Sequence, residues 1–485
     1  MFKFLNRKTS SCLLCKQEFV RLQSTVVAPQ LRTTNTLKKA QFNLKYFYEN
    51  ADAFKDICTK RNTKYTLGED FKELYDQLAT IKQEVIDIKK NSKQYQNTLK
   101  KLVIQQKKEE ADTQEQQKEL HQKLYEFKPI LKEKEETAVK LEDELNLRAD
   151  GLPNLIAPVV GQKQKLVTYI NPTPEILDFK DDDFPLSPDP KRDHKDIMER
   201  LNLVEFQQAT KLSGRGWYYL LGDAALLEQA LVQYALKLAR KTGFKMALPP
   251  SIVKTEVTNA CGFKPRDQNN EKQVYELTGD GLCLTGTAEI PLAGLYSNKE
   301  FNAGELPLEL VGLSRSYRAE AGAAGRDTRG LYRVHEFTKV ELFAWTINDV
   351  EHSNAQFDKM INFQMNFIKS LGLTARMLIM PFDDLGAPAY KKIDIEVLMP
   401  GRGAWGEVSS TSNCLDYQAR RLTTKYKDEK TKKNKYVHTL NGTACAVPRV
   451  VLAIIERFYD PVTDSVLIPK VLRPFMDDKE RITKN

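Results

Sequence analysis

The sequence predicts an α+β protein in which a long helical hairpin precedes a domain of mixed strands and helices. Two observations carry this prediction. Apolar residues recur at heptad spacing in two runs between Phe71 and Leu145, and two apolar-aromatic runs of strand length flank a glycine-rich stretch within residues 316–345. Heptad spacing is typical of coiled coils, whereas strand-like runs around such a turn indicate a β-hairpin.

Composition narrows the class of protein. The 485 residues are 41% hydrophobic and 29% charged, with a formal net charge of +9, which mildly favours a polyanionic partner. No apolar run approaches the ~20 residues that span a bilayer, so we expect no membrane segment. Seven scattered cysteines predict free thiols in a reducing compartment. Cys12 and Cys15 form a lone CxxC without a second pair, so we expect no zinc site.

The first 34 residues hold six Lys or Arg and a single acidic residue, Glu18, among frequent serines and threonines. Their apolar residues allow an amphipathic helix but form no continuous apolar core. This profile predicts a mitochondrial transit peptide, and hence a matrix protein, rather than a secretory signal. The alternative is a disordered basic tail of a cytosolic protein.

The predicted arm consists of two heptad runs joined by a charged patch at residues 107–113, which favours an antiparallel hairpin of two helices. Pro129 is expected to kink the second helix. The outer faces are rich in lysine, so the arm could hold an RNA backbone or could equally be a dimerising coiled coil. The runs comprise Phe71, Leu74, Leu78, Ile81, Val85, Ile88, Ser92, Tyr95, Leu99 and Leu102, then Leu120, Leu124, Phe127, Leu131, Lys134, Ala138, Leu141 and Leu145.

Helix-breaking residues after the arm indicate the domain boundaries. Gly and Pro in residues 151–158 end the second helix, and a polar, Pro- and Asp-rich stretch follows. We therefore predict an arm-bearing domain at 35–158, a linker at 159–192 and a second domain at 193–485. Within the second domain we expect helices at 194–215 and 224–240 and strands at 244–248 and 393–400.

The hairpin at 316–345 gathers an unusual set of charges. Arginines inside a strand pair are costly to bury unless they face anions, so Arg318 and Arg333, with Glu320 and Glu341, predict a polyphosphate pocket. The alternative is a solvated, charge-rich hairpin. The tip carries Arg326 and Arg329, which spacing does not assign to the pocket wall.

Three further motifs add candidate residues. Thr287 and Glu289 lie two apart, where they would face one side of an extended chain and hold a small amine or hydroxyl. Glu407 and Ser410 offer hard oxygens suited to Mg²⁺, and the alternative is an ordinary edge strand before a capped helix. Residues 441–443 predict a turn before an apolar helix. Arg449 in the first turn of that helix opposes the helix dipole, unless an anion sits there.

Together these motifs resemble the seryl-tRNA synthetases of the common, bacterial-like type. The resemblance runs from about residue 40 to the end and rests on ENADAFKDICTKRN, GLPNLIAP, TAE, YRAEAGAAGRDTRGL, EVSS and LNGTACAVPR, in that order. It implies the fold of class II synthetases, an antiparallel β-sheet flanked by helices. It also implies a homodimer, ATP with Mg²⁺, L-serine and tRNA(Ser).

The resemblance implies roles residue by residue. Arg318, Glu407 and Arg449 would be catalytic, Glu407 and Ser410 would hold Mg²⁺, and Thr443 would meet the serine hydroxyl. Arg326 and Arg329 are our hypothesis for contacts with the tRNA acceptor end. The expected ATP-binding residues are Arg318, Ala319, Glu320, Arg333, Val334, Phe337, Glu407, Val408, Ser409, Ser410 and Arg449. The expected serine-binding residues are Thr287, Ala288, Glu289, Arg318, Glu341, Asn441 and Thr443.

Two other functions remain open at this point. A non-catalytic homologue would use the arm to bind RNA or a partner, and such a protein would be expected to lose Arg318, Glu320, Glu407 or Arg449. All four are present. An enzyme that charges a carrier protein is disfavoured, because such relatives lack the arm.

Overall fold

The computed structural model describes residues 37–107, 113–177, 186–266, 271–279, 281–320 and 328–484. The expected transit peptide, the CxxC pair and Arg326 lie outside these residues. The described part of the chain starts with two short helices, α2 (Leu44–Glu49) and α3 (Ala51–Lys60). Their Phe47 and Phe54 pack with Phe71 and Leu145 at the base of the arm in one buried cluster.

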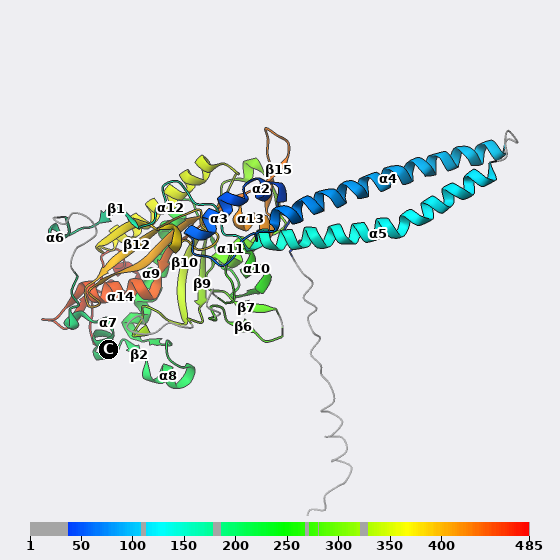
Figure 1. Cartoon of the computed structure of the whole chain (residues 1–485). Helices are drawn as coiled ribbons and strands as arrows, with labels where there is room; N and C mark the ends of the chain where they lie inside the picture. Colours follow the sequence, from blue (N-terminus) through cyan, green and yellow to red (C-terminus); the bar gives the residue numbers. More distant parts are fainter. Residues whose placement is uncertain are drawn as a thin grey trace, which may run out of the picture. The chain divides into compact units, whose positions relative to one another are not determined.

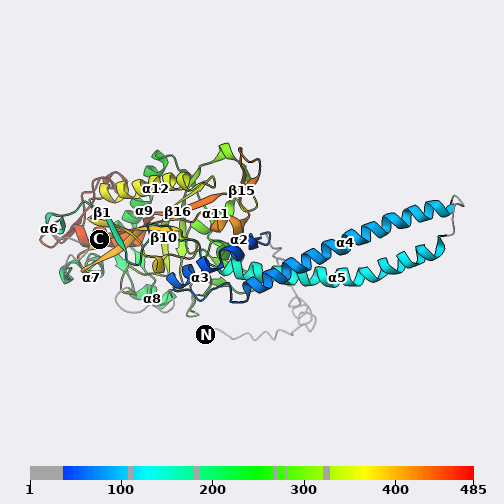
Figure 2. The ribbon, with the colours of Figure 1, turned by 45° about the horizontal axis from the view of Figure 1, so that its top comes forward.

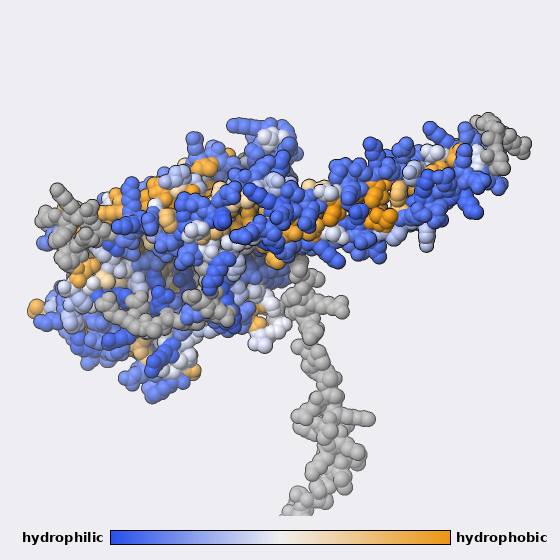
Figure 3. Space-filling model, viewed as in Figure 1, coloured by the Kyte–Doolittle hydropathy of each residue, from blue (hydrophilic) through white to orange (hydrophobic). Residues whose placement is uncertain are grey.

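The arm is an antiparallel helical hairpin of α4 (Phe71–Lys107) and α5 (Gln114–Gly151) (Figure 1). Tyr95 stacks on Phe127 across the predicted seam, with ring centroids 5.7 Å apart. Figure 3 shows apolar side chains along the line between the helices and hydrophilic ones elsewhere on this face. Lys134, at a seam position, donates to Glu84 over 2.6 Å. Helix α5 continues through Pro129, so the heptad prediction is confirmed and the proline does not end the helix.

An eight-stranded sheet forms the centre of the second domain, in the order β1-β11-β12-β13-β16-β10-β9-β4. All neighbours are antiparallel except β4 and β9, which are parallel. The strands are β1 (Lys165–Ile170), β4 (Lys245–Ala247), β9 (Leu308–Tyr317), β10 (Glu336–Thr346), β11 (Ala375–Ile379), β12 (Lys391–Met399), β13 (Ala404–Asn413) and β16 (His438–Ala446). Strand β1 falls within the stretch 159–192 that the sequence suggests is a linker, so that part belongs to the sheet.

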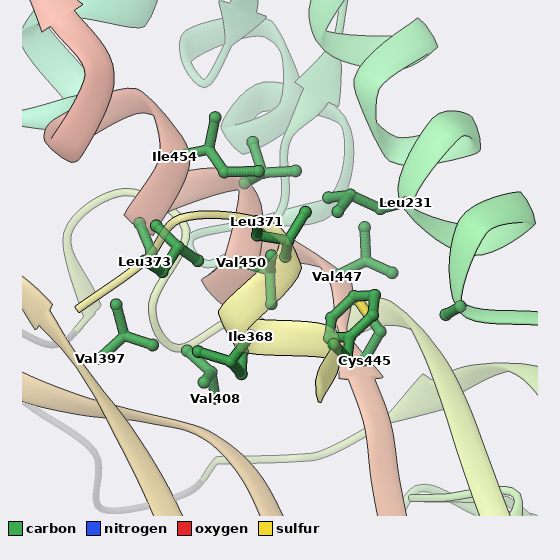
Figure 4. Packing of buried hydrophobic residues seen from close by; sticks show 14 of the residues in the cluster. Leu231, Ile368, Leu371, Leu373, Val397, Val408, Cys445, Val447, Val450 and Ile454 are labelled. Atoms are coloured by element: carbon green, nitrogen blue, oxygen red, sulfur yellow. The ribbon is translucent and has the colours of Figure 1, made fainter. Parts of the chain in front are cut away.

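Helices cover both faces of this sheet, as Figure 2 shows from a second angle. On one side α9 (Gly222–Lys241), α12 (Val350–Ser370) and α14 (Val447–Phe458) share a buried cluster with Val340 and Leu342 of β10. In Figure 4, Leu231, Ile368 and Val450 from these helices converge with Val397 and Val408 from the strands. On the other side α11 (Glu289–Leu295) and α13 (Tyr417–Leu422) pack on Phe343 and Trp345. Successive residues of β10 therefore serve opposite faces.

The remaining elements are short. None of the described helices combines the length and apolar character needed for a bilayer crossing. The short helices are α6 (Pro174–Leu177), η1 (Pro190–Arg192), α7 (His194–Arg200), α8 (Gln207–Ser213), α10 (Thr255–Ala260), η2 (Ala303–Glu305), η4 (Phe382–Asp384) and η5 (Arg473–Phe475). The short strands are β2 (Val204–Glu205), β3 (Tyr219–Leu220), β5 (Ile252–Lys254), β6 (Glu276–Leu277), β7 (Leu282–Leu284), β8 (Glu300–Asn302), β14 (Lys425–Lys427), β15 (Asn434–Tyr436), β17 (Tyr459–Asp460), β18 (Ser465–Leu467) and β19 (Arg481–Ile482).

The single helix expected at 194–215 is wrong. The structure has α7 and α8 with β2 between them. Helix α7 ends before Asn202, which adopts a positive φ of 58°, a conformation that a right-handed helix cannot continue through. Leu203 and Val204 then enter the main core, so burial of this short extended piece replaces the continuous helix.

The turn expected at residues 441–443 is also wrong, because these residues lie within β16. This strand pairs with β10 on one side and β13 on the other. The glycine serves a close approach: a Cβ at Gly442 would lie 2.7 Å from Thr411 Oγ1 and 2.9 Å from the Met360 side chain. Tight packing, rather than a turn, explains this glycine.

Candidate functional site

The ends of β9 and β10, the middle of β13 and the start of α14 surround one cavity. It brings together nine of the eleven residues expected to bind ATP, and it also contains Lys339 and Thr443. Its lining residues are Arg318, Glu320, Leu331, Tyr332, Arg333, Val334, Phe337, Lys339, Glu407, Val408, Ser410, Thr443, Ala446, Pro448 and Arg449. Most residues of the predicted polyphosphate pocket therefore line one cavity.

Two guanidinium groups dominate one part of this cavity. Arg318 follows β9, and its guanidinium lies 5.4 Å from the centroid of the Phe337 ring. Arg449, in the first turn of α14, donates from Nε to the Tyr332 carbonyl over 3.0 Å and from Nη1 to the Glu407 carbonyl over 2.9 Å. Burial, and next the charge of Arg449, lower the pKa of Arg318. Two neighbouring cations and a helix N-terminus together favour an anion.

Glu407 and Ser410 of β13 face this same cavity. Glu407 Oε2 lies 3.3 Å from Arg449 Nη1. Burial by itself would raise the pKa of Glu407, but the charges of Arg449, Lys392 and Arg318 bring it below its ordinary value. The carboxylate is therefore ionised and is a hard oxygen donor beside a hydroxyl, which is the donor chemistry that Mg²⁺ prefers.

Glu320 and Arg333 are expected at different parts of ATP, but the structure pairs them directly. Arg333 Nη1 donates to Glu320 Oε2 over 2.7 Å. Glu320 adopts a positive φ of 47°, which is uncommon for a residue with a side chain. Separate contacts with the adenine and the phosphates require this ion pair to open.

A second group of polar residues is buried beside Arg318 and centres on Glu289. Glu289 Oε1 accepts from Asn441 Nδ2 over 2.9 Å and from Gln418 Nε2 over 2.7 Å. Burial, and next the charge of Glu341, raise the pKa of Glu289 to about 8. Glu289 is the first residue of α11, so the extended conformation expected for Thr287 to Glu289 is wrong. The turn into the helix still keeps the two side chains together, since Glu289 N donates to Thr287 Oγ1.

Glu341 forms the other half of this buried group. Lys339 Nζ lies 2.6 Å from Glu341 Oε2 and 3.1 Å from Thr287 Oγ1. Thr443 Oγ1 donates to Glu341 Oε2 over 3.4 Å. Burial raises the pKa of Glu341, although Lys339 opposes that shift. Carboxylates, hydroxyls and an amide at this spacing suit a small ligand that carries both an ammonium and a hydroxyl.

Besides Thr287, Glu289, Glu341 and Asn441 of the buried group, three residues expected to bind ATP or serine do not line the cavity with their side chains. Ser409 Oγ donates to the Thr443 carbonyl over 2.6 Å and is buried in the sheet. Ala319 is held by its backbone, since its N–H donates to the Gln273 carbonyl over 3.1 Å. Ala288 is fully buried. Of the two tip arginines, Arg329 is exposed, and Arg326 is outside the described residues.

Comparison with known proteins identifies the family. Residues 42–156 match the seryl-tRNA synthetase N-terminal domain, and residues 273–458 match the class II tRNA synthetase core domain (G, H, P, S and T). The mitochondrial serine–tRNA ligase of Schizosaccharomyces pombe is 38% identical over 90% of this chain and 88% of its own length. The chain belongs to the seryl-tRNA synthetase family.

Two other relatives agree with this membership. The mitochondrial serine–tRNA ligase of Saccharomyces cerevisiae is 56% identical over 60% of this chain, and the match spans 65% of that relative. The crystal structure of the Pyrococcus horikoshii seryl-tRNA synthetase complexed with ATP superposes with a TM-score of 0.76. It is 30% identical and covers 92% of this chain and all of that one. The expected α+β fold, with a helical arm before a class II domain, is therefore confirmed.

Sequence reasoning missed several residues of this synthetase site. Lys339 could have been found, because 337, 339 and 341 alternate along one strand and the two outer positions were already assigned. No sequence pattern marks Tyr332 or Gln418, because their surroundings form only in the fold. The Arg402 guanidinium lies 3.8 Å from the Tyr332 ring centroid, and Gln418 comes from the distant helix α13. Lys392, whose charge lowers the pKa of Glu407, is likewise found only in the fold.

Proposed function

We propose that this chain activates L-serine with ATP and transfers the seryl group to the 3′ end of tRNA(Ser). It is an aminoacyl-tRNA ligase by family, and the comparisons give no support to a non-catalytic homologue. The observation that carries the proposal is the place of Arg318. Its positive charge lowers the pKa of Glu407 on the cationic side of the cavity. On the other side, the same charge opposes the rise in the pKa values of Glu289 and Glu341. One guanidinium thus adjoins both a polyphosphate pocket and an ammonium pocket.

The chemistry requires positioning more than acid–base catalysis. A serine carboxylate oxygen attacks the α-phosphorus of ATP, and the bond to pyrophosphate breaks. The terminal ribose hydroxyl of the tRNA then attacks the acyl carbon, loses its proton to solvent or phosphate, and releases AMP. Arg318 would hold the carboxylate and the α-phosphate, while Arg333 and Arg449 would neutralise the outer phosphates. Neutralising charge at fixed distances is the main source of rate in such transfers.

The serine-binding side accounts for selectivity. Glu289, Glu341 and Thr287 would receive the ammonium, and Thr443 with Asn441 would meet the serine hydroxyl. A site built to hydrogen-bond a hydroxyl discriminates strongly against the analogue that lacks it. Because Lys339 now contacts both Glu341 and Thr287, it must give up one of them when the substrate ammonium binds.

Magnesium fits the donor set beside the phosphates. Among the described residues, no group of three or more His, Cys, Asp or Glu side chains is placed to hold a metal. Glu407 and Ser410 would therefore bind the ion together with oxygens of the nucleotide. When bound, the ion would neutralise phosphate charge.

The arm and the sheet edge support two further parts of the proposal. The lysine-rich arm would bind the tRNA through phosphate contacts, which predicts a strong dependence on salt. The edge strand β4 and its neighbours expose Met246, Leu248 and Ile252, which are 47%, 71% and 49% exposed. Such a patch on a sheet edge suits a homodimer interface. Since two relatives carry mitochondrial names and residues 1–34 have the transit profile, we place the protein in the mitochondrial matrix.

The decisive experiment is ATP–pyrophosphate exchange with serine, alanine, threonine and glycine as separate substrates. We expect exchange with serine alone, followed by serine-dependent charging of mitochondrial tRNA(Ser). Folded protein without serine-dependent exchange would contradict the proposal and favour the non-catalytic alternative. Sedimentation of wild type and Leu248→Asp tests the dimer, and the variant is expected to be monomeric.

A further inference from the structure

A second cavity, of 430 Å³, adjoins the first and shares Arg318 with it. Gly286, directly before the serine-site residue Thr287, also lines this cavity. Its walls come from two distant parts of the chain. Thr63, Tyr65 and Pro153 belong to the arm-bearing domain, whereas the segment around Lys264 and Arg318 belongs to the synthetase domain. None of the contacts described for the adenylate and serine sites uses this space.

The wall from the arm-bearing domain is held rigidly. Arg61 donates to the carbonyls of Leu155, Gly386 and Ala389 over 2.9, 3.1 and 2.7 Å. Burial lowers the pKa of Arg61 to about 10, and these fixed acceptors offset part of the cost of burying its charge. The Tyr65 ring, four residues later, is 42% exposed and has Lys264 Nζ 3.3 Å above its centroid.

The opposite wall is attached to the catalytic strand. Gln273 lines the second cavity, and its carbonyl accepts the N–H of Ala319, the neighbour of Arg318. Gln273 N–H in turn donates to the Pro265 carbonyl over 2.9 Å. A ligand that bears on this wall is therefore in contact with the segment that positions Arg318.

The chemistry of the lining is that of a site for single-stranded nucleic acid. Of the described residues that line it, the charged ones are Arg61, Lys264, Arg266 and Arg318, and none is Asp or Glu. Tyr65 and Phe263 supply aromatic surface. Aromatic rings next to Lys and Arg bind unpaired bases by stacking and their phosphates by charge.

We propose that the last unpaired nucleotides of the acceptor RNA pass through this second cavity, with Tyr65 and Lys264 as their stacking and phosphate contacts. The inference rests on the proposed function and adds a role to the arm-bearing domain. The base of that domain forms part of the path by which the terminal ribose reaches the seryl-adenylate, in addition to any capture of tRNA by the arm. Tyr65 and Lys264 touch the RNA away from the reacting atoms, so they are positioning residues.

Single-turnover transfer tests this proposal. Wild type, Tyr65→Leu and Lys264→Gln are each loaded with serine and ATP and then mixed with tRNA, with Lys470→Gln as a matched loss of an exposed lysine elsewhere. We expect serine-dependent exchange within twofold of wild type for all three variants. The transfer rate is expected to fall about tenfold for Tyr65→Leu and Lys264→Gln, the size of one lost base-stacking or phosphate contact, and to stay unchanged for Lys470→Gln.

Binding to a shortened RNA locates the contact. The dissociation constant is measured for full-length tRNA and for tRNA that lacks its 3′-terminal unpaired nucleotides. We expect Lys264→Gln to weaken binding of the full-length tRNA and to leave binding of the shortened one unchanged. Equal weakening of both RNAs, or normal transfer by both cavity variants, would overturn the inference while leaving the proposed function intact. Absence of serine-dependent exchange in the wild type would instead remove the proposed function, and this inference with it.

Discussion

Lysine–glutamate pairs occur both in the arm and at the cavity, but in opposite surroundings. In the arm, the side chains of Lys89 and Glu135 lie 2.7 Å apart and remain 57% and 45% exposed. At the cavity wall, the side chain of Lys339 lies 2.6 Å from that of Glu341, and the two are 9% and 1% exposed. An exposed pair contributes about 0–1 kcal/mol, whereas removing one member of a buried pair leaves a costly unpaired charge. The arm is therefore tolerant of change and the cavity is not.

The largest effect is expected at Arg318, the cation that adjoins both halves of the cavity. Arg318→Ala should lower serine-dependent pyrophosphate exchange on the order of a thousandfold, because a fixed charge at the transferring phosphoryl group is lost. Binding of tRNA, measured by filter retention, should be unchanged. Arg473→Ala, which breaks an ion pair with the largely exposed Glu480 and a hydrogen bond to the Ile468 carbonyl, is the control. Exchange within tenfold of wild type in Arg318→Ala would contradict the assigned role.

Removing the arm tests the other side of the comparison. Deletion of residues 75–142, with a short glycine linker, should leave pyrophosphate exchange within about twofold of wild type. Charging of tRNA should fall on the order of a hundredfold, since the phosphate contacts of α4 and α5 are lost. Both rates are measured on the same protein preparation. Normal charging by the shortened protein would show that the arm does not bind the tRNA.

Substitution of Thr443 tests how strongly the site discriminates serine from alanine. Thr443→Val keeps the shape of the side chain and removes the hydroxyl, which lies 3.4 Å from Glu341 Oε2. We expect kcat/KM for serine to fall on the order of a hundredfold while that for alanine stays near its wild-type value. Thr411→Val, a buried substitution in the neighbouring strand, controls for general damage to the sheet. An equal loss for both amino acids would assign Thr443 to packing.

Glu289 makes the free energy of unfolding depend on pH. Folded Glu289 keeps its proton up to about pH 8, whereas the unfolded carboxyl loses it near its ordinary value of 4.5. The folded state thus binds more protons between these values, and the free energy of unfolding falls as pH rises through this range. In Glu289→Gln the free energy of unfolding should fall less steeply with pH, the slopes differing by at most on the order of 1 kcal/mol per pH unit. Urea unfolding at pH 5, 6.5 and 8 measures it; identical slopes would contradict the raised pKa.

The smallest effect is expected in the arm. Lys134→Met removes the ion pair with Glu84, whose side chains are 34% and 44% exposed, and places an apolar side chain at a seam position. The change in local stability should be below about 1 kcal/mol in either direction. Hydrogen exchange of amides in α5 reports it, with Lys132→Met on the outer face for comparison. A loss of several kcal/mol would mean that the arm, like the cavity, depends on its ion pairs.

The two regions also differ in how far the sequence predicted them. Heptad spacing yielded α4 and α5 because a coiled-coil seam repeats along a single helix pair. The strands β9 and β10 were predicted because their apolar runs bracket a glycine-rich turn. The composition of the cavity followed once the motifs were recognised together. Such patterns lie within single segments of the sequence, so they can be recognised without knowing which segments contact each other.

The predictions that failed concern residues whose conformation depends on contacts between distant segments. Asn441 and Thr443 looked like turn residues, but pairing with strands on both sides overrides the local preference of Gly442. Lys339 and Gln418 acquire their importance only when β10, α11 and α13 meet at Glu289 and Glu341. Strand β1 was assigned to the linker because it is a short edge strand that is only partly buried and lies directly before the Pro- and Asp-rich stretch. The domain limits and the roles of individual site residues remain predictions.

The alternation along β10 sets a limit on how this protein can change over evolutionary time. Phe337 and Lys339 line the cavity and Glu341 pairs with Lys339, while Thr338 donates to Glu228 of α9 over 2.6 Å and Val340 lies in the main core. A one-residue insertion or deletion would exchange these two sets and destroy cavity and core at once. Length variation in this hairpin is therefore confined to its tip, whereas the arm can gain or lose whole heptads.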